Sequence, residues 1–279
     1  MFSRSAGLAA GAVRSCLLFV ACGVELAGCA RLKSAVETLV HRNRASKNPA
    51  ARPSPRSTLA GARLAVILDD VGADAPAVDS IFALNYPLTL SILPNHPHSE
   101  EIAREAHHRG YQVMLHLPME SVANETAEIE ELRPGMSDPQ ITNILSSMLR
   151  SVPYAAGVNN HQGSRATSDP ELMSELMPIL HAHGLFFIDS RTTAATVAYE
   201  AAKAAHVPCA FRNVPFLDDV QETGAIRREL ELAVRDAREK GQAVAIGHPH
   251  AATLRALADF LPHAETAGIH LVHASDVVH

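Results

Sequence analysis

The chain has 279 residues, of which 47% are apolar and 19% charged, with a formal net charge of −6. This composition supports a full-sized buried core, and the acidic balance without a basic stripe excludes nucleic acid as the main partner. The length fits either two average domains or one α/β barrel plus a leader, and we favour the single domain.

Residues 1–29 have the layout of a secretory signal peptide. Arg4 and Arg14 precede an apolar run at 15–24 that is too short to span a bilayer comfortably. The stretch ends in Leu26-Ala27-Gly28-Cys29, which resembles the bacterial lipobox. We therefore predict export to the periplasm or cell envelope, with Cys29 lipidated and holding the protein at the membrane. An ordinary cleaved signal peptide and an uncleaved amphipathic anchor are the alternatives.

Residues 30–60 are predicted to form a tether. The part at 45–60 is rich in Pro, Ser and Arg and has no periodic apolar face. Its prolines favour an extended chain, and its positive charge favours an anionic membrane or wall surface. The folded domain is therefore expected to be 61–279.

After Gly61, short apolar runs alternate with segments of helical periodicity. The predicted strands are 64–68, 88–93, 112–115, 155–158, 185–188, 208–211, 243–246 and 269–272. The predicted helices are 99–108, 137–151, 169–183, 197–206, 226–240 and 251–260. Repeated strand-helix units imply parallel strands with right-handed crossovers. Seven or eight such units predict an α/β barrel, complete or incomplete.

Polar residues directly follow five of the predicted strands. They are Asp69 and Asp70, His116, the segment from Asn159 to His161, Asp189, and His248. The carboxyl ends of parallel barrel strands share one face, where catalytic groups collect. We therefore expect these side chains to converge although they are far apart in the sequence.

Each of these residues also has a purely structural interpretation. An Asp after a strand is often a helix N-cap, and His116 could be a hydrogen-bonded core histidine. The adjacent carboxylates of Asp69 and Asp70, however, need a cation or a shared proton to offset their repulsion. One carboxylate with two neutral imidazoles is a common catalytic zinc set that leaves room for water. The pattern therefore indicates a metal site at this face.

Five ordered segments resemble the successive signatures of the divergent polysaccharide deacetylases. They are AVILDD at 65–70, MLHLPM at 114–119, GVNNHQGS at 157–164, FIDSRTT at 187–193 and AIGHP at 245–249. The resemblance runs from about residue 62 to the C-terminus. It implies a NodB-like distorted (β/α)7–8 barrel in a single domain, and a carbohydrate polymer or oligosaccharide as substrate.

The resemblance also implies roles for individual residues. Mainstream deacetylases of this fold place two metal histidines four residues apart, whereas this chain has Glu120 four residues after His116. The second imidazole is therefore expected from His161, with Asp70 and His116 completing the ligand set for one divalent ion, most simply zinc. Asp69 is then the expected general base, and His248 the expected general acid.

Four further residues are candidate substrate contacts. Asn160 and Arg165 lie close to His161 in the sequence. Asp189 and Arg191 could orient a histidine, hold substrate or form a structural salt bridge. The remaining histidines, such as His107 and His181, fall on predicted helix surfaces or ends, and we do not expect them to be ligands.

The sequence therefore predicts a metal-dependent hydrolase that removes acetyl groups from N-acetylated or O-acetylated envelope carbohydrate. The alternative is an envelope-tethered protein that binds glycan or a partner, with a structural metal and no turnover. Asp69 and His248 favour the enzyme, because a binding protein needs neither a base nor an acid. A hydrolase for phosphate or peptide substrates is disfavoured, since there is no glycine-rich phosphate loop and no His-Glu-x-x-His helix.

Overall fold

The computed structural model describes residues 61–279, apart from residue 74 and residues 124–127. The predicted signal peptide at 1–29, with Cys29, and the predicted tether at 30–60 lie outside the described residues. Among the helices that the structure describes, none is both long and apolar enough to cross a membrane.

Strands and helices alternate along the described chain. The strands are β1 (Ala62–Val71), β2 (Thr89–Ile92), β3 (Gln112–Met119), β4 (Gly157–Gln162), β5 (Phe186–Asp189), β6 (Cys209–Phe211), β7 (Gln242–Gly247) and β8 (Ile269–Val272). The α-helices are α2 (Ala75–Leu84), α3 (Ser99–His108), α4 (Asp138–Ser151), α5 (Pro170–His183), α6 (Ala198–Ala204), α7 (Thr223–Lys240) and α8 (Ala251–Thr266). Each predicted strand and helix is present; α3 and β8 have the predicted ends, and the ends of the others are shifted.

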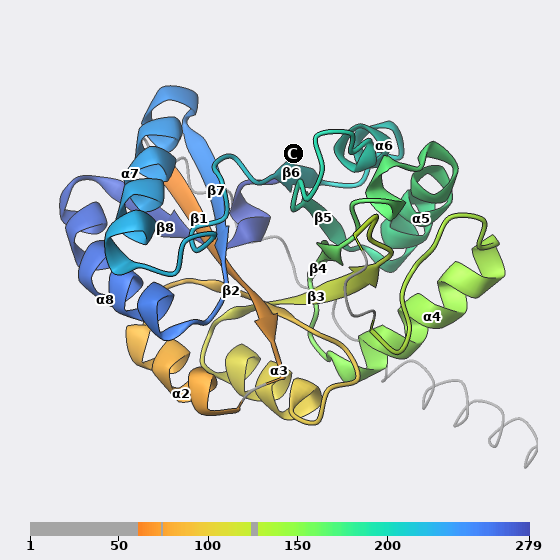
Figure 1. The fold of residues 1–279 in the computed structure, drawn as a ribbon, viewed down its shortest axis with the longest axis horizontal. Helices are drawn as coiled ribbons and strands as arrows, with labels where there is room; N and C mark the ends of the chain where they lie inside the picture. The colour runs from red at the N-terminus through yellow and green to blue at the C-terminus, as the bar shows by residue number, and fades with distance from the viewer. Residues whose placement is uncertain (1–60, 74, 124–127) are drawn as a thin grey trace, which may run out of the picture. The chain divides into compact units, whose positions relative to one another are not determined.

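The strands form one parallel sheet with the helices around its outside (Figure 1). The strand order is β6-β5-β4-β3-β2-β1-β7, and β8 pairs with the first half of β1. The long central strand β1 therefore contacts β2, β7 and β8 along its length. This arrangement confirms the predicted single-domain α/β barrel.

The barrel is closed between β6 and β7 by a loop, not by a strand ladder. In the loop that follows β6, Asn213 N donates to Val244 O at 3.0 Å, and Leu217 N donates to Ile246 O at 2.9 Å. The side chain of Asn213 also accepts a hydrogen bond from Val244 N at 2.8 Å. Because this loop runs beside β7, its residues after Leu217 lie at the carboxyl end of β7.

Both faces of the sheet are buried. On the outer face, residues such as Leu64, Val66 and Leu68 pack with the helices in a large apolar cluster. On the inner face, the alternating residues Ala65 and Ile67 pack with other strand residues and the C-terminal segment in a smaller cluster. Strand alternation therefore decides which side chains point into the barrel.

The structure departs from the predicted helices in two places. Helix α2 was not among them, because its sequence is apolar on most sides and offers little helical periodicity. Helix α8 continues past the predicted end at residue 260, through Pro262 to Thr266. Buried Leu261 and Ala264 pack into the core beyond that point, and this packing offsets the cost of a proline inside the helix.

We predict that Phe187→Ala lowers the free energy of unfolding by about 3–5 kcal/mol. Phe187 lies in β5 with its side chain fully buried in the outer cluster, so truncation removes apolar contacts and leaves a cavity. Chemical denaturation of the variant and the parent protein measures the difference. Val122→Ala, at a residue that is 75% exposed, is the control and should change stability by less than about 0.5 kcal/mol. A loss below about 1 kcal/mol for Phe187→Ala would contradict the described packing.

Candidate metal centre

The end of β1 is irregular at the two adjacent carboxylates. Strand alternation would send Asp69 and Asp70 to opposite faces of the sheet. Asp70 instead has a φ of +57°, and the register of β1 against β2 shifts between Leu68 and Val71. A left-handed conformation at a residue other than glycine costs about 1–3 kcal/mol. This bulge turns both carboxylates toward the same centre.

Asp70, His116 and His161 meet at the carboxyl ends of β1, β3 and β4. Asp70 Oδ1 lies 3.1 Å from His116 Nε2 and 3.0 Å from His161 Nδ1, and these two nitrogens lie 3.1 Å apart. Asp70 Oδ1 is buried, yet no donor reaches it in good hydrogen-bond geometry. Ligand atoms at about 2.0–2.2 Å from one tetrahedral ion are themselves about 3.3–3.6 Å apart, only a few tenths of an ångström wider than this spacing. These three atoms therefore fit a divalent metal such as zinc.

The two carboxylates differ in their electrostatics. Burial raises the pKa of Asp69, and the nearby histidines offset this only in part. Burial acts on Asp70 in the same direction, but the contacts with His116 and His161 outweigh it and hold the pKa of Asp70 well below its usual range. Asp70 is thus held as an anion, as a metal ligand must be, and Asp69 has the higher proton affinity of the two.

Asn159, in β4, connects the ligand His116 to Asp69. Its Oδ1 accepts a hydrogen bond from His116 Nδ1 at 2.9 Å, and its Nδ2 donates to Asp69 Oδ1 at 2.9 Å. The hydroxyl of Ser91 also donates to Asn159 Oδ1, and Asn159 Nδ2 also donates to Ser190 Oγ at 3.1 Å. Because His116 Nδ1 is the donor to an amide oxygen, Nε2 carries the lone pair that faces the centre.

A tight turn positions His161. Gln162 and Gly163 follow it with φ values of +52° and +84°, and a Cβ on Gly163 would lie 2.9 Å from Met119 Cβ. Beyond the turn, the backbone nitrogen of Arg165 donates to Glu120 O at 3.1 Å. Arg165 Nη1 lies 3.4 Å from Glu120 Oε1, so this carboxylate forms an ion pair outside the ligand set.

His248 lies after β7, across the centre from His161. Its Nε2 lies 3.8 Å from Asp70 Oδ2, and its Nδ1 lies 2.9 Å from Asp218 Oδ1. Asp218 is also held by His248 N at 2.6 Å and Thr253 Oγ1 at 2.8 Å, both on Oδ2. Burial lowers the pKa of His248, but the Asp218 hydrogen bond and the charges of Asp69 and Asp70 outweigh it and raise the pKa to about 9.

A second group of ligand-type atoms comprises Asp218, His248 and His250. Both oxygens of Asp218 already accept hydrogen bonds, and His250 is exposed. The Asp218 carboxylate is therefore better suited to orient His248 than to bind an ion.

The predicted substrate residues lie around the centre, but two of them are enclosed. Asn160 Oδ1 accepts from Ser190 N at 2.9 Å, and Asp189 accepts from Arg191 N at 2.8 Å and from Thr196 Oγ1 at 2.9 Å. Both side chains are buried on the outer face of their strands. The exposed guanidinium of Arg191 lies 3.5 Å from the ring centroid of Phe211, so it makes no salt bridge to Asp189. Substrate contact by any of these residues, or by Arg165, stays a prediction.

Sequence reasoning assigned no role to four residues of the site: Asn159, Ser91, Ser190 and Asp218. The first three alternate with outward-facing strand residues, so the period of two could have placed them inside the barrel. Asp218 follows Phe216 and Leu217 and precedes Asp219, which repeats the pattern of two apolar residues and two aspartates at the end of β1. This repeat was a usable signal.

The family model described as divergent polysaccharide deacetylase matches residues 66–278 of this chain. The protein YibQ of Escherichia coli (strain K12) is 40% identical over 199 residues, covering 71% of this chain and 62% of its own length. A protein of Haemophilus influenzae is 37% identical over 200 residues, covering 72% of this chain and 71% of that protein.

Among solved structures, the protein ATU2773 of Agrobacterium tumefaciens C58 has a similar fold. It superimposes with a TM-score of 0.75 at 23% identity, covering 80% of this chain and 92% of that chain. The residues that the family model matches, 66–278, run from within β1 to beyond β8 and include all three candidate ligands. The chain therefore belongs to the divergent polysaccharide deacetylase family.

Proposed function

We propose that the protein is a metal-dependent hydrolase that removes acetyl groups from N-acetylated or O-acetylated carbohydrate of the cell envelope. One observation carries the proposal: three ligand-type atoms of Asp70, His116 and His161 lie within 3.1 Å of one another, with Asp69 and His248 beside them. The family membership supports a polysaccharide as the substrate.

Asp70, His116 and His161 would hold the ion, for which zinc is the proposed identity. A bound divalent ion polarises an acyl carbonyl and lowers the pKa of water. Catalytic zinc sites commonly have three protein ligands and one open position, and the described ligand set matches that count.

Asp69 is the proposed general base. Its Oδ1 is held by Asn159 Nδ2, and its Oδ2 lies 3.7 Å from His116 Nε2, so the second oxygen faces the centre. The pKa raised by burial makes this carboxylate a better proton acceptor than an exposed aspartate. The attacking water would give its proton to Asp69.

His248 is the proposed general acid. Its raised pKa keeps the imidazole protonated near neutral pH, and the Nδ1 hydrogen bond to Asp218 leaves Nε2 directed toward the centre. In amide hydrolysis, His248 would give its proton to the departing sugar amine. Asp218 is a positioning residue in this scheme, since it acts through His248.

The proposed location in the periplasm or cell envelope rests on the sequence of residues 1–60, including lipidation of Cys29. This proposal agrees with a polymer substrate outside the cytoplasm. The fate of Cys29 can be determined by mass spectrometry of the protein isolated from bacterial membranes.

Metal analysis of the full-length protein, coupled to acetate release from acetylated glycans, tests the function. We expect about one equivalent of metal and acetate release that stops when a chelator removes the metal. One equivalent of metal with no acetate from any acetylated glycan would instead support a binding protein with a structural metal.

We predict that His161→Ala abolishes metal binding, whereas Asp69→Asn keeps the metal and loses about 100- to 10,000-fold in kcat. The first change removes a ligand, and the second removes only the base. Elemental analysis and acetate release measured on the same samples separate the two effects. Equal metal loss in both variants would show that the roles are wrongly assigned.

We predict that Asn159→Ala lowers metal affinity by about 10- to 100-fold, because His116 loses the partner that fixes its ring. Competition with a chromophoric chelator measures the affinity. Asn160→Ala is the matched control: Asn160 is the next residue and equally buried, but its amide holds the loop at Ser190. Equal affinity losses in the two variants would indicate general loosening of β4.

We predict that Asp218→Asn shifts the alkaline limb of the rate profile to lower pH. His248 must be protonated to act, so activity falls as the pH rises through its pKa of about 9. Loss of the Asp218 charge lowers that pKa, and the fall then begins at a lower pH. Acetate release across the pH range measures the limb, and Asp219→Asn, at an exposed neighbour, should leave it unchanged. An unshifted limb in Asp218→Asn would count against His248 as the acid.

A further inference from the structure

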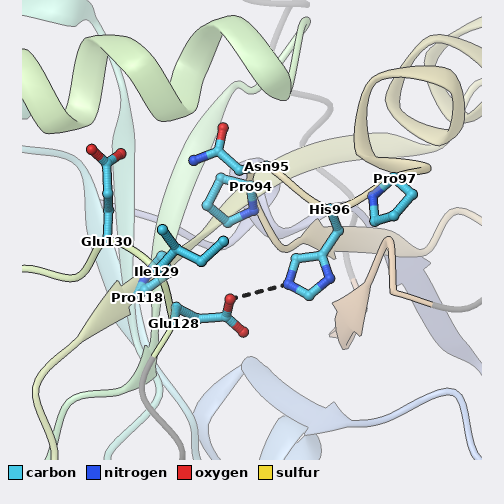
Figure 2. Close-up of a pocket in the computed structure, with 8 residues that line it drawn as sticks. All are labelled: Pro94, Asn95, His96, Pro97, Pro118, Glu128, Ile129 and Glu130. Carbon is cyan, nitrogen blue, oxygen red and sulfur yellow. Dashed lines mark hydrogen bonds and ion pairs between the residues drawn. The ribbon is translucent and has the colours of Figure 1, made fainter.

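A small cavity of about 200 Å³ lies at the carboxyl end of β2 and β3, between the loop after β2 and the loop after β3 (Figure 2). Its lining residues are Pro94, Asn95, His96, Pro97, Pro118, Glu128, Ile129 and Glu130. None of these residues belongs to the ligand set or to the proposed acid and base.

The cavity adjoins the strands that carry the metal centre. Pro118 lies two residues after His116 on the same side of β3, and it pairs in register with His161. On the other side, Leu93 N donates to Val71 O at 2.8 Å, which ties the loop after β2 to the residue that follows Asp70. The segments that line the cavity therefore leave the barrel beside the ligand residues.

The walls combine rigid apolar surface with hydrogen-bonding groups. Three prolines and Ile129 supply the apolar part, and Ile129 is 93% exposed although it is a large aliphatic side chain. His96 Nε2 lies 3.1 Å from Glu128 Oε2 in a hydrogen-bonding contact (Figure 2). Both side chains are about one quarter exposed. Asn95 and Glu130 are exposed at the mouth.

We infer that this cavity binds one neutral or amino sugar of the glycan chain next to the acetylated unit. This inference rests on the proposed function. A pyranose ring has an apolar C–H face for the prolines and Ile129, and hydroxyls for the imidazole, amide and carboxylates. The volume lies below the range of about 300–1,000 Å³ typical of larger ligands, which fits a single ring. The carboxylates of Glu128 and Glu130 disfavour a sugar that carries its own carboxylate.

The test is calorimetric binding of the N-acetylglucosamine tetramer to the full-length, metal-loaded protein. Ile129→Ser and His96→Ala should each weaken binding about five- to twentyfold and leave metal content unchanged. Val220→Ser is the matched control, because Val220 is also an exposed aliphatic residue (55% exposed) but belongs to the loop after β6, and it should bind as the parent does. Unchanged affinity in both cavity variants, or no binding of the tetramer by the parent protein, would overturn the inference.

Acetate release from the same tetramer separates this inference from the proposed function. Binding that depends on Ile129 and His96 without acetate release would reject the hydrolase and keep the sugar site. Acetate release with equal KM in the parent and both cavity variants would reject the sugar site and keep the hydrolase.

A second probe tests the selectivity for charge. A tetrasaccharide with a carboxylate on alternate sugars should bind the parent protein at least about tenfold more weakly than the neutral tetramer. In the double variant Glu128→Gln, Glu130→Gln, the difference between these two affinities should become smaller. Equal affinity of the parent protein for the two tetrasaccharides would overturn the assignment to neutral and amino sugars.

Discussion

The candidate site depends on the left-handed backbone at Asp70. A regular strand would point only one of two adjacent carboxylates into the barrel, and the other would be buried against the helices. The bulge at the end of β1 brings both to one centre, at a conformational cost of about 1–3 kcal/mol. Two neighbouring anions also repel each other, so this arrangement needs positive charge nearby. A divalent ion held by Asp70 and the two imidazoles would supply it.

The rest of the barrel interior supports this centre through buried polar groups. Ser91, His116 and Asn159 lie in the adjacent strands β2, β3 and β4, and Ser190 directly follows β5. They form one hydrogen-bonded group around the amide of Asn159. An amide suits this place because its oxygen accepts from His116 while its nitrogen donates to Asp69. The ligand and the proposed base are therefore positioned by the same side chain, and neither can move without disturbing the other.

Much of this arrangement could be predicted from the sequence. Apolar runs and helix start signals located every strand of the described barrel, and the polar residues at the strand ends indicated the face that holds Asp70, His116 and His161. Strand ends alone did not separate inward from outward side chains, so Asn160 was selected while its inward neighbour Asn159 received no role. Asp218 was missed because it lies in a loop, and its contact with His248 depends on how that loop closes the barrel. The repeated pattern of two apolar residues and two aspartates could mark Asp218 as a candidate, but no local pattern specifies that its partner is His248.

The geometry also bears on whether the centre is catalytic or structural. Structural zinc sites commonly surround the ion with four protein ligands, whereas catalytic sites leave one position for water or substrate. In the described part of the chain, His248 is the nearest further imidazole, but its Nδ1 is engaged by Asp218 and its Nε2 lies 3.8 Å from Asp70 Oδ2. An imidazole held by a carboxylate at Nδ1 can serve either as a ligand or as an acid, but the ligand-type atoms that lie within reach of one ion are those of Asp70, His116 and His161, without His248. The position of His248 Nε2 outside this ligand group therefore favours a proton donor beside an open position over a fourth ligand that closes it.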